Sequence, residues 1–125
     1  LDVGHRYRPD VVSLTECGVP TCWGECGAVT CRKLGELASE FPATHIAVCK
    51  WAHSDITGYA NMLRSELALP PRMAPFELLS IPDNGADEFI SDDGEVLLTR
   101  ANLQIVQLAE LALQEASLAH SDKMR

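Results

Sequence analysis

A tandem repeat of seven residues near the N-terminus is the feature that most constrains how this chain can fold. Residues 16–22, ECGVPTC, match residues 25–31, ECGAVTC, at five of seven positions. Four of the five cysteines lie in this repeat. Because residues 16–30 also contain three glycines and a proline, a continuous helix is disfavoured there. We therefore expect two loops of similar shape, each holding two cysteines.

The spacing of these cysteines, C-x4-C-x3-C-x4-C, predicts a metal site formed by Cys17, Cys22, Cys26 and Cys31. Four thiolates can surround one zinc ion tetrahedrally, with Zn–S distances of about 2.3 Å. A glycine follows the first cysteine of each loop, where it can adopt a positive φ and turn backbone N–H groups toward sulfur. Structural zinc is the leading interpretation. Two local disulfides, an iron–sulfur cluster and free thiols are the alternatives.

A second possible set of metal ligands lies downstream, at His45, Cys49 and His53. On a helix these residues would form one stripe, and imidazole and thiolate at this spacing could share an ion. The alternative is a small buried cysteine between two surface histidines. With a histidine as its base, Cys49 would also be the nucleophile of a thiol-dependent enzyme or redox protein.

Apolar spacing predicts a mainly α fold in one domain, with a Cys-rich N-terminal loop pair and one β-hairpin before a long C-terminal helix. The predicted regions are an N-terminal arm and Cys-repeat loops (1–31), a helical region (32–69), a connector and hairpin (70–99) and a C-terminal helix (100–119). Within them we expect a strand at 10–14, helices at 31–41, 44–53 and 56–69, and a hairpin at 88–98. The last helix is apolar nearly all round, so it would lie in the core or pack against a second copy.

The apolar positions Leu34, Leu37, Val48 and Trp51 are spaced as in the helix-turn-helix of phage and bacterial repressors. The segment Leu34 to Trp51 resembles that motif, which implies a small DNA-binding regulator. Basic and outward-facing positions that would then contact nucleic acid are Arg32, Lys33, Thr44, His45 and Lys50. Two packed helices of an ordinary bundle are the alternative interpretation.

Charge argues against a nucleic-acid surface over most of the chain. The net charge is −8, and residues 65–125 carry 4 basic against 11 acidic side chains, whereas residues 1–64 carry 6 against 7. The acidic half would repel phosphate. No apolar run approaches the length of a membrane span, and the start of the chain lacks a signal-peptide pattern. If the cysteines are reduced, we expect an intracellular, cytoplasmic protein; if they form disulfides, we expect a secreted one.

Together these features favour a non-enzymatic protein-interaction or assembly module stabilised by the four-cysteine site. Its partner would be another protein or a second copy, bound through the C-terminal helix. The DNA-binding regulator is the first alternative, and the thiol-dependent enzyme or redox protein using Cys49 is the second.

Overall fold

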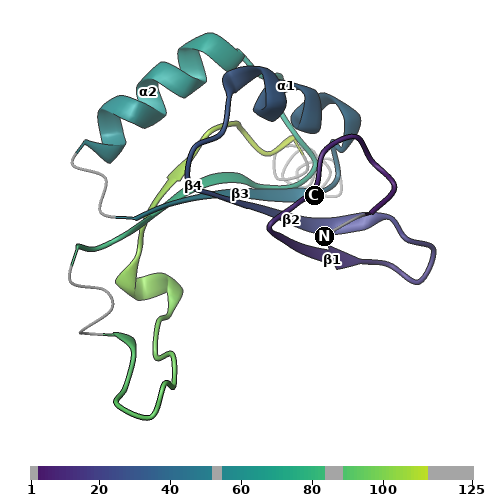
Figure 1. The fold of residues 1–125 in the computed structure, drawn as a ribbon. Helices are drawn as coiled ribbons and strands as arrows, with labels where there is room; N and C mark the ends of the chain where they lie inside the picture. The colour runs from purple at the N-terminus through teal and green to yellow at the C-terminus, as the bar shows by residue number, and fades with distance from the viewer. Residues whose placement is uncertain (1–2, 52–54, 84–88, 113–125) are drawn as a thin grey trace, which may run out of the picture.

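The structure is a computed structural model of the chain and describes residues 3–51, 55–83 and 89–112. These residues form a five-stranded sheet with two α-helices packed on one side (Figure 1). The elements are, in chain order, β1 (Val11–Leu14), β2 (Pro20–Cys26), α1 (Cys31–Glu40), β3 (His45–Trp51), α2 (Ile56–Leu67), β4 (Phe76–Ile81), the 3-10 turn η1 (Arg100–Asn102) and β5 (Gln104–Gln107).

The strands lie in the sheet in chain order, β1-β2-β3-β4-β5. The three inner strands run parallel, and β1 and β5 pair antiparallel at the two edges. Each parallel step needs a crossover connection, which α1 and α2 provide, and such crossovers are almost always right-handed. Because both crossovers step in the same direction, α1 and α2 lie on the same face of the sheet (Figure 1). Within the described residues, the opposite face has no α-helix.

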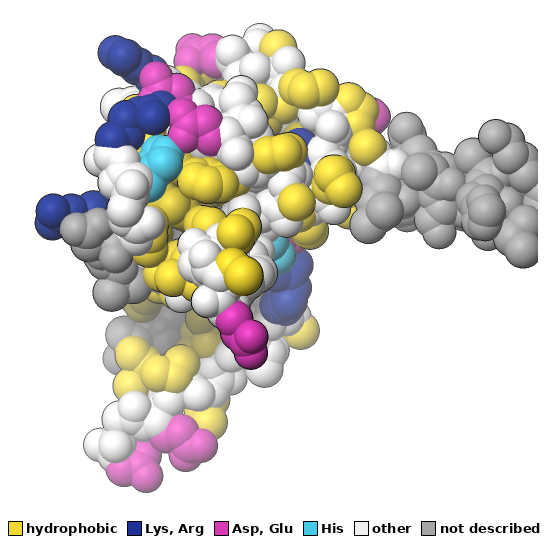
Figure 2. Space-filling view, turned by 90° about the vertical axis from the view of Figure 1, so that its right-hand side faces the viewer, with side chains coloured by type: hydrophobic (Ala, Val, Ile, Leu, Met, Phe, Trp, Pro, Cys, Tyr) yellow, Lys and Arg dark blue, Asp and Glu magenta, His cyan; other side chains and the backbone are white. Residues whose placement is uncertain are grey.

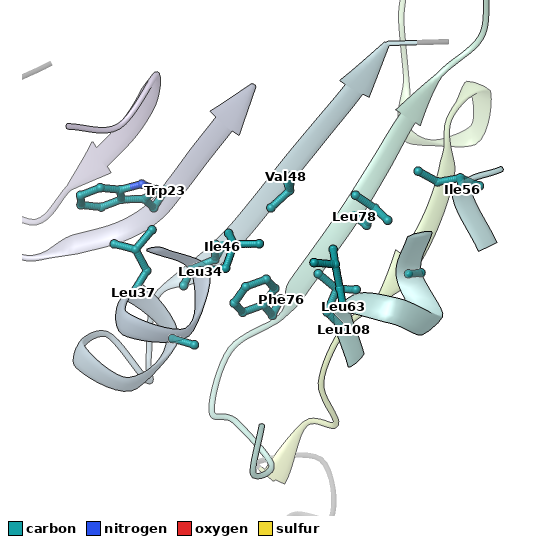
Figure 3. Packing of buried hydrophobic residues seen from close by; sticks show 12 residues of the cluster. Trp23, Leu34, Leu37, Ile46, Val48, Ile56, Leu63, Phe76, Leu78 and Leu108 are labelled. Carbon is teal, nitrogen blue, oxygen red and sulfur yellow. The ribbon is translucent and has the colours of Figure 1, made fainter. Parts of the chain in front are cut away.

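The hydrophobic core fills the space between the sheet and the two helices (Figure 3). Alternate strand residues point toward the helices, and those with no exposed surface are Trp23, Ile46, Val48, Phe76 and Leu78. The helices contribute Leu34, Leu37, Ala38, Ile56, Ala60 and Leu63. Burying apolar surface contributes roughly 25 cal/mol per Å², so this layer is the main source of the domain's stability.

Arg72 is a buried cation that joins several segments below the helices. Its guanidinium donates to the carbonyl oxygens of Ala38 at 2.8 Å, Phe41 at 3.1 Å and Thr44 at 2.7 Å. Only 3% of the residue is exposed. Its backbone N–H also donates to the carbonyl of Glu110, at 2.7 Å. Arg72 therefore satisfies carbonyls at the end of α1 and just before β3, and it shares the Phe41 carbonyl with the N–H of Thr44.

The expectation of a mainly α fold is wrong, because a mixed sheet is the centre of the molecule. The predicted helix at 44–53 is the central strand β3. Its two β-branched residues, Ile46 and Val48, are fully buried while their neighbours are half-buried. That is the period-2 pattern of a strand with one face on the core.

The Cys-rich loop pair and the connector each contain a strand as well. The end of the first repeat copy, the two residues between the copies and the start of the second copy belong to β2, which runs from Pro20 to Cys26. The connector predicted for 70–99 contains β4, whose sequence FELLSI is buried at four of six positions, three on the core face and one, Glu77, on the opposite face. Prolines at 70, 71, 75 and 82 flank this strand rather than interrupt it, which is why it tolerates them.

The C-terminal helix predicted for 100–119 is also wrong over its described part. Residues 100–102 form a 3-10 turn, and residues 104–107 form β5. Ile105 and Val106 are opposite Leu79 and Leu78 of β4, so β-branched packing against a strand prevails over helix propensity. Residues 113–119 of the prediction lie outside the described residues.

Several local predictions are confirmed. Helix α1 begins after Thr30, whose hydroxyl accepts from the N–H of Lys33 at 3.1 Å. Helix α2 begins after Asp55, whose carboxylate accepts from the N–H of Gly58 at 2.9 Å. The strand at 10–14 corresponds to β1. In the predicted hairpin, Ile90 and Val96 form an antiparallel bridge.

Candidate functional site

The face of the sheet away from the helices carries three of the five cysteines together with His45 and Glu77, and we call it the open face. Strand alternation and the pairing register assign its residues. They are Val11, Ser13, Cys22, Gly24, Cys26, His45, Ala47, Cys49, Trp51, Glu77, Leu79, Ile81, Ile105 and Gln107. All of them are half-buried or exposed except Glu77, so this face is open to contact.

Glu77 is the centre of a polar network on this face. It is 1% exposed, and its carboxylate accepts from Arg100 at 2.7 and 3.1 Å and from Gln107 at 2.8 Å. The ring Nε2 of His45 lies 2.5 Å from the same carboxylate. The Arg100 hydrogen bonds, and secondly those from His45 and Gln107, lower the pKa of Glu77 to about 2 against the opposing effect of burial. Glu77 is therefore an anion at neutral pH.

This network fixes the orientation of the His45 ring. An ionised carboxylate only accepts hydrogen bonds, so Nε2 of His45 carries the hydrogen that Glu77 receives. Nδ1 is then the ring nitrogen that does not contact Glu77. The register places Cys22 of β2 opposite His45, so a thiol, an imidazole and a carboxylate follow one another across three neighbouring strands.

The structure does not bring the four repeat cysteines together. Cys22 and Cys26 lie on the same face of β2, but four residues apart, which is about 13 Å along a strand. Cys17 is exposed in the β1–β2 connection. Cys31 begins α1, where a hydrogen bond with Glu66, followed by burial, raises the pKa of its thiol.

A single tetrahedral zinc needs all four sulfurs within about 2.3 Å of one ion, so the predicted zinc site would require β2 to open. Within the described residues, no group of three or more His, Cys, Asp or Glu side chains is arranged to hold a metal ion. The glycines after Cys17 and Cys26 do have positive φ, 83° and 78°. Their N–H groups donate to the carbonyls of Thr15 and Cys49. The first bond closes a turn, and the second continues the pairing of β2 with β3. Zinc and an iron–sulfur cluster stay predictions.

The predicted stripe of His45, Cys49 and His53 is not helical. His45 and Cys49 lie on the same face of β3 at a separation of about 13 Å, and His53 lies outside the described residues. Cys49 instead has Cys26 of β2 as its register partner. Sequence spacing gave no signal for this pair, because the two cysteines are separated by a whole crossover.

The predicted nucleic-acid residues do not form one surface either. Because residues 45–51 are a strand, residues 34–51 contain no helix-turn-helix. Arg32 is exposed on α1 and lies 3.2 Å from Glu36. Lys33 lies 2.8 Å from the buried carboxylate of Glu25. Both cations of α1 are therefore engaged with carboxylates.

The other three members of this set point in different directions. Thr44 is 2% exposed, and its hydroxyl donates to the carbonyl of Pro20 at 2.7 Å. His45 lies on the open face, bound to Glu77. Lys50 lies on the helix side, where its ammonium donates to the carbonyl of Gly27. A continuous phosphate-binding track needs cations on one face, and these residues do not provide it.

A second charged cluster, which the sequence did not predict, holds the N-terminal arm on α1. Arg6 lies 2.5 Å from Glu40 and 3.0 Å from Glu36. Tyr7 donates to Glu36, and this bond is the largest cause that lowers the Glu36 pKa to about 2. Figure 2 shows acidic and basic side chains side by side at the upper left, next to exposed hydrophobic surface. These groups neutralise one another, so the cluster anchors the arm.

Comparisons of the chain with protein-family models, with curated proteins and with solved structures found no match. Fold and site therefore define the class by themselves: an α/β domain with a mixed sheet, helices on one face, and a reactive open face. In the described part of the chain, no helix has the length and apolar character needed to cross a membrane.

Proposed function

We propose that this chain is a non-enzymatic assembly module that associates with a second copy of itself through the open face of its sheet. The observation that carries the proposal is the placement of both helices on one side of β2, β3 and β4. All-parallel sheets occur almost only with both faces covered, because their strands are apolar on both sides, and the three inner strands of this sheet are parallel. A second sheet packed about 10 Å away would cover this one.

The centre of the open face has the composition of such an interface. Its half-buried residues Ala47, Leu79, Ile81 and Ile105 lie on neighbouring strands. Trp51, at the end of β3, is 54% exposed, and exposed aromatic residues are typical anchors of interfaces. A contiguous apolar surface of this kind on a small protein marks an interaction site.

Charge on this face also permits two copies to approach. Although the chain has a net charge of −8, the Glu77 carboxylate is surrounded by Arg100 and His45. The open-face strand residues other than His45 and Glu77 are uncharged. Like-charge repulsion, which would oppose self-association over the acidic remainder of the chain, is therefore weak here.

The area of the open face determines how tightly we expect two copies to bind. Five strands spaced by about 4.8 Å, and about six residues long, give a projected area of about 400 Å². A standard interface buries about 800 Å² of accessible surface per partner. The corrugated surface exceeds its projection, so we expect a dissociable dimer rather than an obligate one. A twofold axis would place the same strands of both copies against each other.

Sedimentation velocity from about 1 µM to about 100 µM tests this proposal, because that range spans the dissociation constants of weak dimers. The wild-type protein should shift from monomer to dimer. The variant Leu79→Glu places a charge at the centre of the open face and should remain monomeric. Met62→Glu is the matched control, because Met62 is 39% exposed on α2, and it should dimerise like the wild type.

The proposal is wrong if the wild type stays monomeric throughout this range, or if both glutamate variants dimerise equally. Circular dichroism of both variants checks that each is folded. Thiol alkylation gives an independent readout: Cys49 on the open face should react more slowly as protein concentration rises, whereas Cys17 in the exposed β1–β2 connection should not change.

A further inference from the structure

Two cysteines that are distant in sequence are neighbours at the carboxyl ends of β2 and β3. Cys26 and Cys49 are paired in the parallel register, so their side chains leave the sheet on the same face. Neighbouring strands lie about 4.8 Å apart, and disulfides span Cα separations of about 4.4–6.8 Å. The register thus holds this pair within reach of a covalent bond.

The backbone around the pair is fixed on both sides. The N–H of Cys26 donates to the carboxylate of Asp10 at 2.8 Å. The N–H of Gly27 donates to the carbonyl of Cys49 at 3.2 Å. Both strands are therefore held in position before any reaction, which favours a bond between these two sulfurs over bonds that need chain movement.

The other three cysteines have no comparable neighbour. The register partner of Cys22 is His45, not a cysteine. Cys17 lies in the β1–β2 connection, and Cys31 lies at the start of α1. Of the five cysteines in the chain, all of them described, Cys26 and Cys49 form the one pair opposite each other on adjacent strands.

We propose that Cys26 and Cys49 form a reversible thiol–disulfide exchange site whose substrate is a low-molecular-weight disulfide such as oxidised glutathione. The thiolate of Cys26 attacks one sulfur of the substrate, whose S–S bond breaks, and the released thiolate takes up a proton. Cys49 then loses its proton and attacks the Cys26 sulfur, which releases the second thiol. Two protein thiols are oxidised by two electrons, and one disulfide is reduced to two thiols.

The exposure of Cys26 and Cys49 indicates which cysteine attacks the substrate first and which one completes the disulfide. Cys26 is exposed, so a substrate in solution can reach it. Cys49 is half-buried, and burial together with the neighbouring Cys26 raises the pKa of its thiol. The accessible cysteine makes the first attack, and the less accessible one resolves the mixed disulfide. The carboxyl ends of the strands, where the pair lies, are also where α/β sheets carry their sites.

The test exposes the reduced full-length chain, at about 1 µM, to mixtures of reduced and oxidised glutathione. Acid quenching, alkylation and peptide mass spectrometry then map every cysteine. The expected product has a single link between Cys26 and Cys49, which accumulates as the oxidised fraction of glutathione rises and disappears when reductant is added. The variant Cys49→Ser should stop at a mixed disulfide on Cys26. The variant Cys26→Ser should leave Cys49 reduced.

Cys22→Ser and Cys17→Ser are matched controls and should form the link at the wild-type rate. A link between any other two cysteines, or glutathione adducts spread over all five without a link, would overturn the proposal. A link that forms only at protein concentrations at which the chain dimerises would do so as well, because the site requires only one chain. Formation of the link in a wild-type protein that stays monomeric at every concentration would refute the proposed self-association alone.

Discussion

Replacement of Arg72 by methionine should lower the free energy of unfolding by about 3 kcal/mol. Methionine keeps much of the side-chain volume but removes the guanidinium that donates to three carbonyl oxygens at 2.7–3.1 Å. The bonds to Ala38 and Thr44 are buried, and each buried acceptor left without a partner costs about 1–3 kcal/mol. Release of a cation from the interior offsets part of this loss.

Urea denaturation followed by circular dichroism measures this effect, and the thermal midpoint should fall by roughly 12 °C, at about 4 °C per kcal/mol. Arg64→Met is the control, because Arg64 makes its hydrogen bonds on the exposed surface, to the backbone carbonyl of Gln107 at 3.0 Å and to the side-chain oxygen of Asn61 at 2.5 Å, and their loss should cost less than about 1 kcal/mol. Arg72→Lys keeps the charge but loses the planar fork, so it should fall between the two. A loss below about 1 kcal/mol for Arg72→Met would refute the reasoning, because it would mean that the buried carbonyls find other partners.

Two further predictions concern acid stability and a helix cap. The Arg100 hydrogen bonds hold the folded-state pKa of Glu77 near 2, below its ordinary value of 4.5, so this carboxylate stabilises the protein above about pH 4.5 and the contribution is lost as the pH falls toward 2. The stability difference between the wild type and Glu77→Gln should therefore be constant at neutral pH and shrink in acid; a difference independent of pH would contradict it. Thr30→Ala should cost about 1 kcal/mol in urea, because it removes the cap of α1, whereas Thr30→Ser should restore it; equal stability of both variants would show that the cap contributes nothing.

Local signals in the sequence were sufficient for the elements whose boundaries are set by nearby residues. Helix α1 follows from the apolar spacing of Leu34 and Leu37, whereas its cap at Thr30 is seen only in the structure. Helix α2 follows from Asp55 and the prolines after residue 69. Both depend on interactions within one turn of the chain. The positive φ of the glycines after Cys17 and Cys26 belongs to the same class of local signal.

The central sheet could not be predicted in the same way, because each strand is stabilised by partners far along the chain. The seven residues of β3 fit a helix nearly as well as a strand by apolar spacing alone. What decides between them is pairing with β2, whose residue 22 pairs with residue 45, and with β4, whose residue 76 pairs with residue 46. Likewise, Ile105 and Val106 become a strand because β4 offers an edge for them, although their surroundings in sequence favour a helix.

The cysteines show the same difference between what local sequence predicts and what long-range pairing decides. The sequence by itself determined that reactive thiols concentrate in residues 17–31 and that glycine turns follow two of them. Tertiary structure alone decided which thiols meet, because a strand holds residues on the same face at fixed intervals and separates Cys22 from Cys26 by about 13 Å. The parallel register then brings Cys49, from beyond helix α1, to Cys26. Residues a few positions apart in sequence are far apart along an extended strand. Hydrogen bonds between strands, in contrast, bring together residues that are distant in sequence, and sequence spacing gives no sign of such pairs.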